Sequence, residues 1–107
     1  MKEQRAAMAD ALAYLRLQMK VAHLWPNTPP TFEALQSTAP FAVDTMDFES
    51  WLAFIFIPKM EAVIQSGGNL PDMKIYPAAE MYLSSDAKLV LSCIEQIDAI
   101  AASAQRG

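Results

Sequence analysis

Few residues of this chain are suited to catalytic or metal chemistry. It has one cysteine, Cys93, and one histidine, His23. A structural zinc site built from cysteine and histidine needs about four such ligands, so one is excluded within a single chain. Cys93 lies on an apolar helical stripe, where a thiol is usually a small buried hydrophobe. His23 lies near the end of a helix, where a positive charge complements the helix dipole. We therefore expect no reactive thiol, no metal and no cofactor.

Two groups of acidic residues invite a functional interpretation. Asp44, Asp47 and Glu49 could bind a divalent cation or act as an acid and base pair. Acids at the start of a helix also bind its free amides and complement its dipole, and we favour that interpretation. Glu80 lies on a short helix, and Lys59 is its expected partner, because a buried carboxylate needs a cation. This pair either fastens two helices together or belongs to a pocket.

Basic residues gather on one side of the first helix. At about 100° per residue they share an arc of about 60° beside the apolar face. They are Lys2, Arg5, Arg16, Lys20 and His23, and we call the last four the basic stripe. Such a stripe could contact RNA phosphates or an acidic partner, or its charges could pair with neighbouring helices. Pairing is favoured, because no aromatic or glycine-rich RNA-binding motif accompanies the stripe.

The apolar spacing predicts four helices and no strand, folded as a small antiparallel four-helix bundle. Met8, Leu12, Leu15 and Met19 recur on one side of the first helix, which is expected over residues 1–24. The other helices are expected over residues 45–65, 78–83 and 87–105, the last after a break and cap at Ser84, Ser85 and Asp86. With 107 residues, the chain is long enough for one domain, 1–107.

The whole architecture depends on the second helix. Apolar residues surround it on every side, so it is expected to be central and wrapped by its neighbours. Thr45 or Asp47 should cap its start, and Gly67 should end it. Pro58 has no amide hydrogen to donate to the preceding turn, so we expect a kink there rather than two separate helices.

A long connection is expected between the first and second helices. Residues 25–44 contain four prolines and no helical periodicity. A structureless loop of that length is unusual in a small domain, so side chains should pin it down. We expect Phe32, Leu35 and Phe41 to be these pins, with a short helical turn over residues 31–37.

Composition narrows the classes of protein further. Hydrophobic residues make up 53% of the chain and charged residues 19%, which excludes intrinsic disorder. The net charge of −4 argues against DNA binding. With only three glycines, the chain also lacks the residues for a glycine-rich phosphate-binding loop. No apolar run approaches the roughly 20 residues of a membrane span, and no signal peptide is visible. A free thiol without an export signal favours the cytoplasm.

Several short motifs also recur in a consistent order. They are Pro40-Phe41, Asp44-Thr45, Phe48, Trp51-Leu52, Phe54, Ile57-Pro58-Lys59-Met60, Leu70-Pro71, Ile75, Pro77 and Glu80. Together they resemble the YqcC family, small bacterial proteins of uncharacterised function, and the resemblance implies an all-α bundle. Family members are often encoded beside a tRNA pseudouridine synthase. We do not expect that activity here, because those enzymes are much larger mixed α/β proteins. Lys59 stands where members commonly have arginine, which disfavours bidentate recognition of a carboxylate or phosphate.

The leading hypothesis is a non-enzymatic interaction module, either an accessory to tRNA modification or a small homo-oligomer. Its partner would be an unknown protein or a second copy, with tRNA contact through the basic stripe less favoured and no membrane or DNA involved. The alternative is a small enzyme or metabolite binder with a pocket around Lys59 and Glu80. The binding groove is expected to be lined by Phe41, Asp44, Trp51, Lys59, Tyr76 and Glu80.

Overall fold

The described part of the chain, residues 2–42, 44–84 and 87–106 of a computed structural model, is helical and contains no strand. Its elements are α1 (Lys2–Val21), 3₁₀ turns at Ala34–Gln36 and Pro40–Ala42, α2 (Phe48–Trp51), a π turn (Leu52–Phe56), α3 (Ile57–Ser66), α4 (Tyr76–Tyr82) and α5 (Lys88–Arg106). We call the uninterrupted run through α2, the π turn and α3 the α2–α3 helix. The predicted all-α class with four helices is thus confirmed. Within these residues, no helix combines the length and apolar character needed to cross a bilayer.

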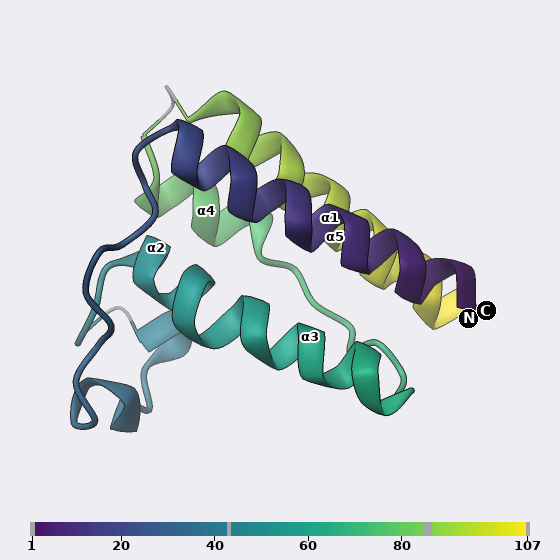
Figure 1. The fold of residues 1–107 in the computed structure, drawn as a ribbon, viewed down its shortest axis with the longest axis horizontal. Helices are drawn as coiled ribbons and strands as arrows, with labels where there is room; N and C mark the ends of the chain where they lie inside the picture. Colours follow the sequence, from purple (N-terminus) through teal and green to yellow (C-terminus); the bar gives the residue numbers. More distant parts are fainter. Residues whose placement is uncertain (1, 43, 85–86, 107) are drawn as a thin grey trace.

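An antiparallel pair, α1 and α5, forms the frame of the molecule, as Figure 1 shows. Each helix buries a stripe of apolar residues that recur every three or four positions. These buried residues are Met8, Leu12, Leu15 and Met19 on α1, and Val90, Ile94, Ile97 and Ala101 on α5. The stripe predicted for the first helix is therefore confirmed at these four positions, whereas Leu89, which continues the spacing on α5, is 57% exposed. The cap expected at Ser85 and Asp86 lies outside the described residues.

The α2–α3 helix covers one side of this pair (Figure 1). It contributes six residues to the core, namely Phe48, Leu52, Ala53, Phe56, Ile57 and Met60. It is not wrapped on every side as its apolar composition predicted, because Pro58, Lys59 and Ala62 are exposed. The two longer helices already bury each other, so the third needs only one face for the core. Most of its remaining apolar residues are half-buried, and three of them, Trp51, Ile55 and Val63, line a hollow.

Pro58 interrupts the hydrogen bonding of this helix without ending it. The helix continues to Ser66, and the kink expected at Pro58 stays a prediction. The turn just before the proline is a π turn, in which the amide of Ile57 donates to the carbonyl of Leu52, five residues back. A wider turn at this place accommodates the missing amide of Pro58.

The ends of the α2–α3 helix depend on the backbone more than on side chains. At the C-terminal end Gly67 has φ of 75°, a left-handed conformation that glycine adopts without steric cost. The amide of Gly68 donates to the carbonyl of Val63 at 3.1 Å, which closes the last turn. At the start, Asp47 is the capping residue by position, but its carboxylate makes no capping hydrogen bond. The Thr45 hydroxyl donates to loop carbonyls instead, so the expected side-chain cap is wrong.

The loop between α1 and α2 is held differently from the prediction. The expected short turn is present as the 3₁₀ turn Ala34–Gln36, but Phe32 is 78% exposed and Leu35 is also exposed. Neither pins the loop, because polar contacts hold that stretch instead. The Thr45 hydroxyl donates to the carbonyl of Ala34 at 2.8 Å. Of the three predicted pins, only Phe41 packs against the core.

Candidate functional site

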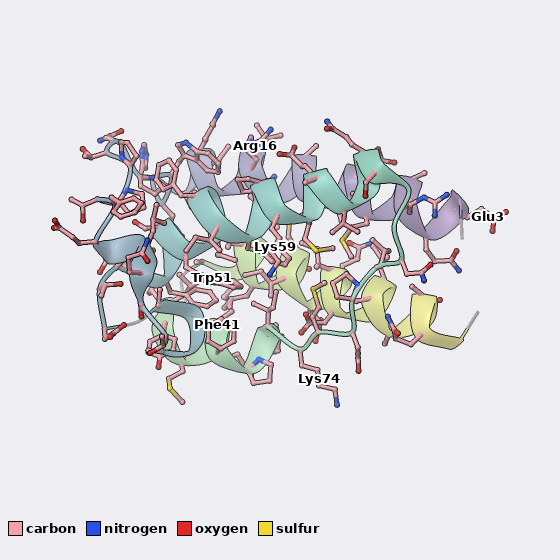
Figure 2. All side chains as sticks on the ribbon, turned by 90° about the horizontal axis from the view of Figure 1, so that it is seen from below. Glu3, Arg16, Phe41, Trp51, Lys59 and Lys74 are labelled. Carbon is pink, nitrogen blue, oxygen red and sulfur yellow. The ribbon has the colours of Figure 1, made fainter. Side chains whose placement is uncertain are left out.

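A hollow of about 370 Å³ lies between the α2–α3 helix and the connection that follows it, residues 69–75. We call it the groove. One wall comes from the helix and consists of Trp51, Ile55, Phe56, Lys59, Met60 and Val63. The other comes from the connection and consists of Pro71, Met73, Lys74 and Ile75. Phe41 reaches in from the loop beside Trp51 at one end (Figure 2).

Three aromatic rings pack together at the Phe41 end of the groove. The ring centroid of Phe41 lies 4.9 Å from that of Trp51 and 5.7 Å from that of Phe48, with both contacts edge-on. Each such contact contributes about 0.5–1.5 kcal/mol beyond simple burial. These contacts offset the cost of the left-handed backbone of Phe41, which has φ of 58°. Backbone strain of this kind persists where packing holds it, and binding sites are common places for it.

The connection wall of the groove is fastened to α5 at both of its ends. The carboxylate of Asp98 accepts hydrogen bonds from the amides of Ile75 and Tyr76, with shortest distances of 2.8 Å to each. Gln105 Nε2 donates to the carbonyl of Leu70 at 2.8 Å. The side chains of Leu70 and Ile75 are also buried. The wall is therefore set in place before any ligand arrives, which lowers the entropy cost of binding.

Asp98 is a positioning residue that sequence reasoning missed. α4 has no side-chain cap from its own segment, and Asp98 supplies one from a different helix. A carboxylate is well suited to this place, because it accepts several amide hydrogens and complements the helix dipole. The only signal in the sequence is an acid directly beside the apolar stripe of α5.

Lysines carry all the charge on the described residues that line the groove. Lys59 and Lys74 are both exposed, one on each wall, and no carboxylate lines the hollow with them. This is opposite to the balance of the whole chain, in which twelve acidic residues outnumber eight basic ones. The groove thus combines an apolar floor with a positive edge.

A family model described as tRNA pseudouridine synthase C, DUF446, matches residues 7–100. This range contains both walls of the groove and most of the bundle. The chain belongs to this family.

Two relatives and one solved structure support membership of the DUF446 family. An uncharacterized protein of Haemophilus influenzae is 44% identical over 61 residues, which cover 57% of this chain and 58% of that protein. Escherichia coli YqcC is 34% identical over 80 residues, 71% of this chain and 73% of that protein. The solution NMR structure of E. coli YqcC has a TM-score of 0.81 and 29% identity, and covers 92% of this chain and 88% of its own. The predicted resemblance to the YqcC family is confirmed.

A third relative is much longer than this DUF446 chain. The tRNA pseudouridine synthase C of Pectobacterium carotovorum is 40% identical over 58 residues, which are 54% of this chain but 15% of that protein. Most of the protein that carries the enzyme name therefore has no counterpart here.

The structure brings together some of the residues predicted for the groove and leaves others outside it. Phe41, Trp51 and Lys59 line the hollow. Tyr76 directly follows the connection wall but does not line the hollow. Asp44 is exposed in the loop, where it accepts a hydrogen bond from the hydroxyl of Ser37, so it is not part of the groove.

Glu80 also lies outside the groove, and its predicted ion pair with Lys59 is wrong. Both side chains are exposed and no ion pair joins them. Glu80 instead faces the hydroxyl of Tyr76, four residues earlier on α4. Burial raises the pKa of Tyr76, and the carboxylates of Glu80 and Glu95 raise it further. A carboxylate on a short exposed helix needs no cation, because water solvates it.

The basic stripe is not a uniform cationic surface. Arg16 forms an ion pair with Glu61 at 3.2 Å, and its guanidinium lies 5.8 Å from the centre of the Trp25 ring. The ammonium of Lys20 lies 5.3 Å from the same ring. His23 is exposed, Arg5 is half-buried near the other end of α1, and the side chain of Lys2 lies outside the described residues. Part of the stripe therefore serves to hold α1 to its neighbours.

Replacing Arg16 with alanine is expected to lower the free energy of unfolding by no more than about 1 kcal/mol. The Arg16 and Glu61 side chains are 38% and 42% exposed, so water and salt screen their attraction. Urea unfolding of the single variants and of the double variant with Glu61→Ala measures the coupling. A coupling energy above about 2 kcal/mol would contradict the assignment as a surface pair.

Cys93 is buried between α1 and α5, as predicted for a small hydrophobe, and is 3% exposed. Burial raises the pKa of its thiol above the ordinary value. Because the thiolate is the reactive form, we expect iodoacetamide at pH 8 to alkylate the folded protein at least about ten-fold more slowly than the urea-unfolded protein. Equal rates would show that the α1 and α5 pair opens readily.

Among the described residues, no three His, Cys, Asp or Glu side chains are placed to hold a metal ion.

Proposed function

We propose that this chain is a non-catalytic binding module that docks on a partner protein through the groove, and that the partner is an enzyme of tRNA modification. The observation that carries the proposal is the groove itself, an apolar hollow with fixed walls and a positive edge. Protein interfaces typically centre on aromatic anchors such as Trp51, enclosed by a more polar rim.

The residues that line the groove favour binding over catalysis. They include no histidine, cysteine, carboxylate or hydroxyl group. General acid and base catalysis needs at least one group that can exchange a proton near neutral pH, and Lys59 and Lys74 are exposed to water rather than desolvated. The alternative pocket built on Lys59 and Glu80 loses its carboxylate, because Glu80 lies outside the groove.

The proposed partner follows from the Pectobacterium relative. There, a segment similar to this chain makes up 15% of a protein named tRNA pseudouridine synthase C. Two parts joined in one polypeptide meet at a high effective concentration, so evolution retains such a joining readily when the parts act together. We infer that in the present case the module is supplied as a separate chain, in the cytoplasm where tRNA is modified.

The test is a binding measurement with the tRNA pseudouridine synthase C of the same organism. Titration of the synthase with this chain, followed by calorimetry and sedimentation, is expected to show a complex of defined stoichiometry with a dissociation constant in the micromolar range or tighter. Val63→Arg places a bulky charge in the groove and is expected to weaken the complex about ten-fold or more.

Ala62→Arg is the matched control, because Ala62 is the exposed neighbour of Val63 and does not line the groove. It is expected to leave the affinity unchanged. Two results would overturn the proposal: no complex at concentrations of about 100 µM, or a complex that both arginine variants weaken equally. Self-association without synthase binding would favour a homo-oligomer instead.

A further inference from the structure

The charged residues at the groove indicate which charge its ligand should have. Lys59 stands on α3 and Lys74 on the opposite connection (Figure 2), both exposed and neither in an ion pair within the described residues. Two like charges beside an acid-free apolar hollow attract an anionic group and repel a cationic one. Because the protein as a whole is acidic, this positive edge also distinguishes the groove from the rest of its surface.

The floor of the groove is suited to apolar side chains of varied shape. Trp51 is half-buried and supplies a large, rigid contact surface. Met60 and Met73 stand on opposite walls, and methionine adapts its shape to irregular ligands. The π turn before Pro58 spans Leu52–Phe56 and contributes Ile55 and Phe56 to the same floor. π turns inside helices are frequent at functional sites.

We propose that the groove binds a short segment of a partner protein that presents apolar side chains to Trp51 and Met73 and acidic side chains to Lys59 and Lys74. This inference rests on the proposed function, since it names the chemistry of the partner at the same site. The hollow is partly open to solvent. Small-molecule sites instead bury most of the surface of their ligand. An open groove with positive charge on both walls fits an acidic, apolar peptide segment.

The experiment uses a random 12-residue peptide display library selected on the full-length chain, with the Val63→Arg variant used to remove peptides that bind elsewhere. Enriched peptides are expected to combine aromatic or branched apolar residues with aspartate or glutamate. Their affinities are then measured by the fluorescence of Trp51 in a Trp25→Phe background. Replacing the acids of a selected peptide by their amides is expected to weaken binding about ten-fold, and less so at high salt.

A charge-reversal variant tests the proposed charge preference more directly. The double variant Lys59→Glu with Lys74→Glu is expected to lose binding of the acidic peptides about ten-fold or more and to bind versions of them with lysine in place of the acids. Both lysines are exposed, so these changes should leave the fold intact, which circular dichroism verifies. Lys88→Glu is the matched control, because Lys88 is exposed on α5 and does not line the groove.

Each remaining outcome counts against the inference. Enrichment of neutral or basic apolar peptides, affinities that the double reversal does not change, or removal of every selected peptide by the Val63→Arg step would overturn it. Laurate that occupies the groove and displaces every peptide would assign the site to a small amphiphile instead. The library contains no synthase, so the peptide experiment and the synthase experiment can fail independently. If acidic peptides bind the groove but the synthase does not, the charge preference of the groove is supported and only the named partner is rejected.

Discussion

Replacing Leu52 with alanine is expected to lower the free energy of unfolding by about 3 kcal/mol, the largest single-residue effect that we predict. Leu52 is 0% exposed, is the first residue of the π turn and belongs to the core. Its truncation removes buried apolar surface and leaves a cavity that three helices cannot close without moving together. Urea unfolding followed by circular dichroism measures the loss, with an unchanged dependence on urea concentration.

Leu17→Ala is the matched control for this prediction. The same side chain is lost from α1 at a position that is 53% exposed, so the expected cost is below about 1 kcal/mol. If the two alanine variants lose the same stability, the α2–α3 helix is not packed as described. The assignment of the groove would then fail as well, because this helix forms one of its walls.

Replacing Asp98 with alanine is expected to lower the free energy of unfolding by about 2 kcal/mol and to weaken binding at the groove. The change leaves the amides of Ile75 and Tyr76 without their acceptor, at a place where water has limited access. The connection wall then loses one of its two attachments to α5. Faster hydrogen exchange of these two amides, measured by NMR, is the local sign of the same loss.

Two further variants separate this role from a general effect of charge. Asp98→Asn keeps an oxygen acceptor, so about half of the lost stability should be retained. Asp72→Ala removes an exposed acid from the connection itself and is expected to change stability by less than about 0.5 kcal/mol. A loss at Asp98 no greater than that at Asp72 would show that the wall does not depend on this carboxylate.

The presence of the helices was predictable because local patterns determine them, whereas some of their ends differ from the prediction: α1 ends at Val21 and α4 begins at Tyr76. The spacing of Met8, Leu12, Leu15 and Met19 requires a helix with one buried side, and the structure buries that side. Gly67 ends a helix because its own backbone adopts the left-handed conformation, which glycine adopts without steric cost. Phe41, Trp51 and Lys59, which the sequence analysis grouped together, line the same hollow, and their binding role stays a prediction.

Contacts between distant segments were not predictable in the same way. Asp98 binds amides more than twenty positions earlier, and no periodicity reports such a pairing. Glu80 was placed with Lys59 on the assumption that it was buried, and that assumption depends on the tilt of α4. The π turn shifts the register of the helix around Pro58, so a pattern counted at a uniform angle cannot identify the side that faces water.

The antiparallel pairing of α1 with α5 determines how long the apolar face of α1 stays exposed during translation. α1 leaves the ribosome with its apolar stripe complete, while the helix that will cover the stripe has yet to be made. Contacts between segments so far apart also form late, because a long loop must close first. The buried face of α1 is thus synthesised before the helix that shields most of it, and a nascent chain is most prone to aggregate in that interval.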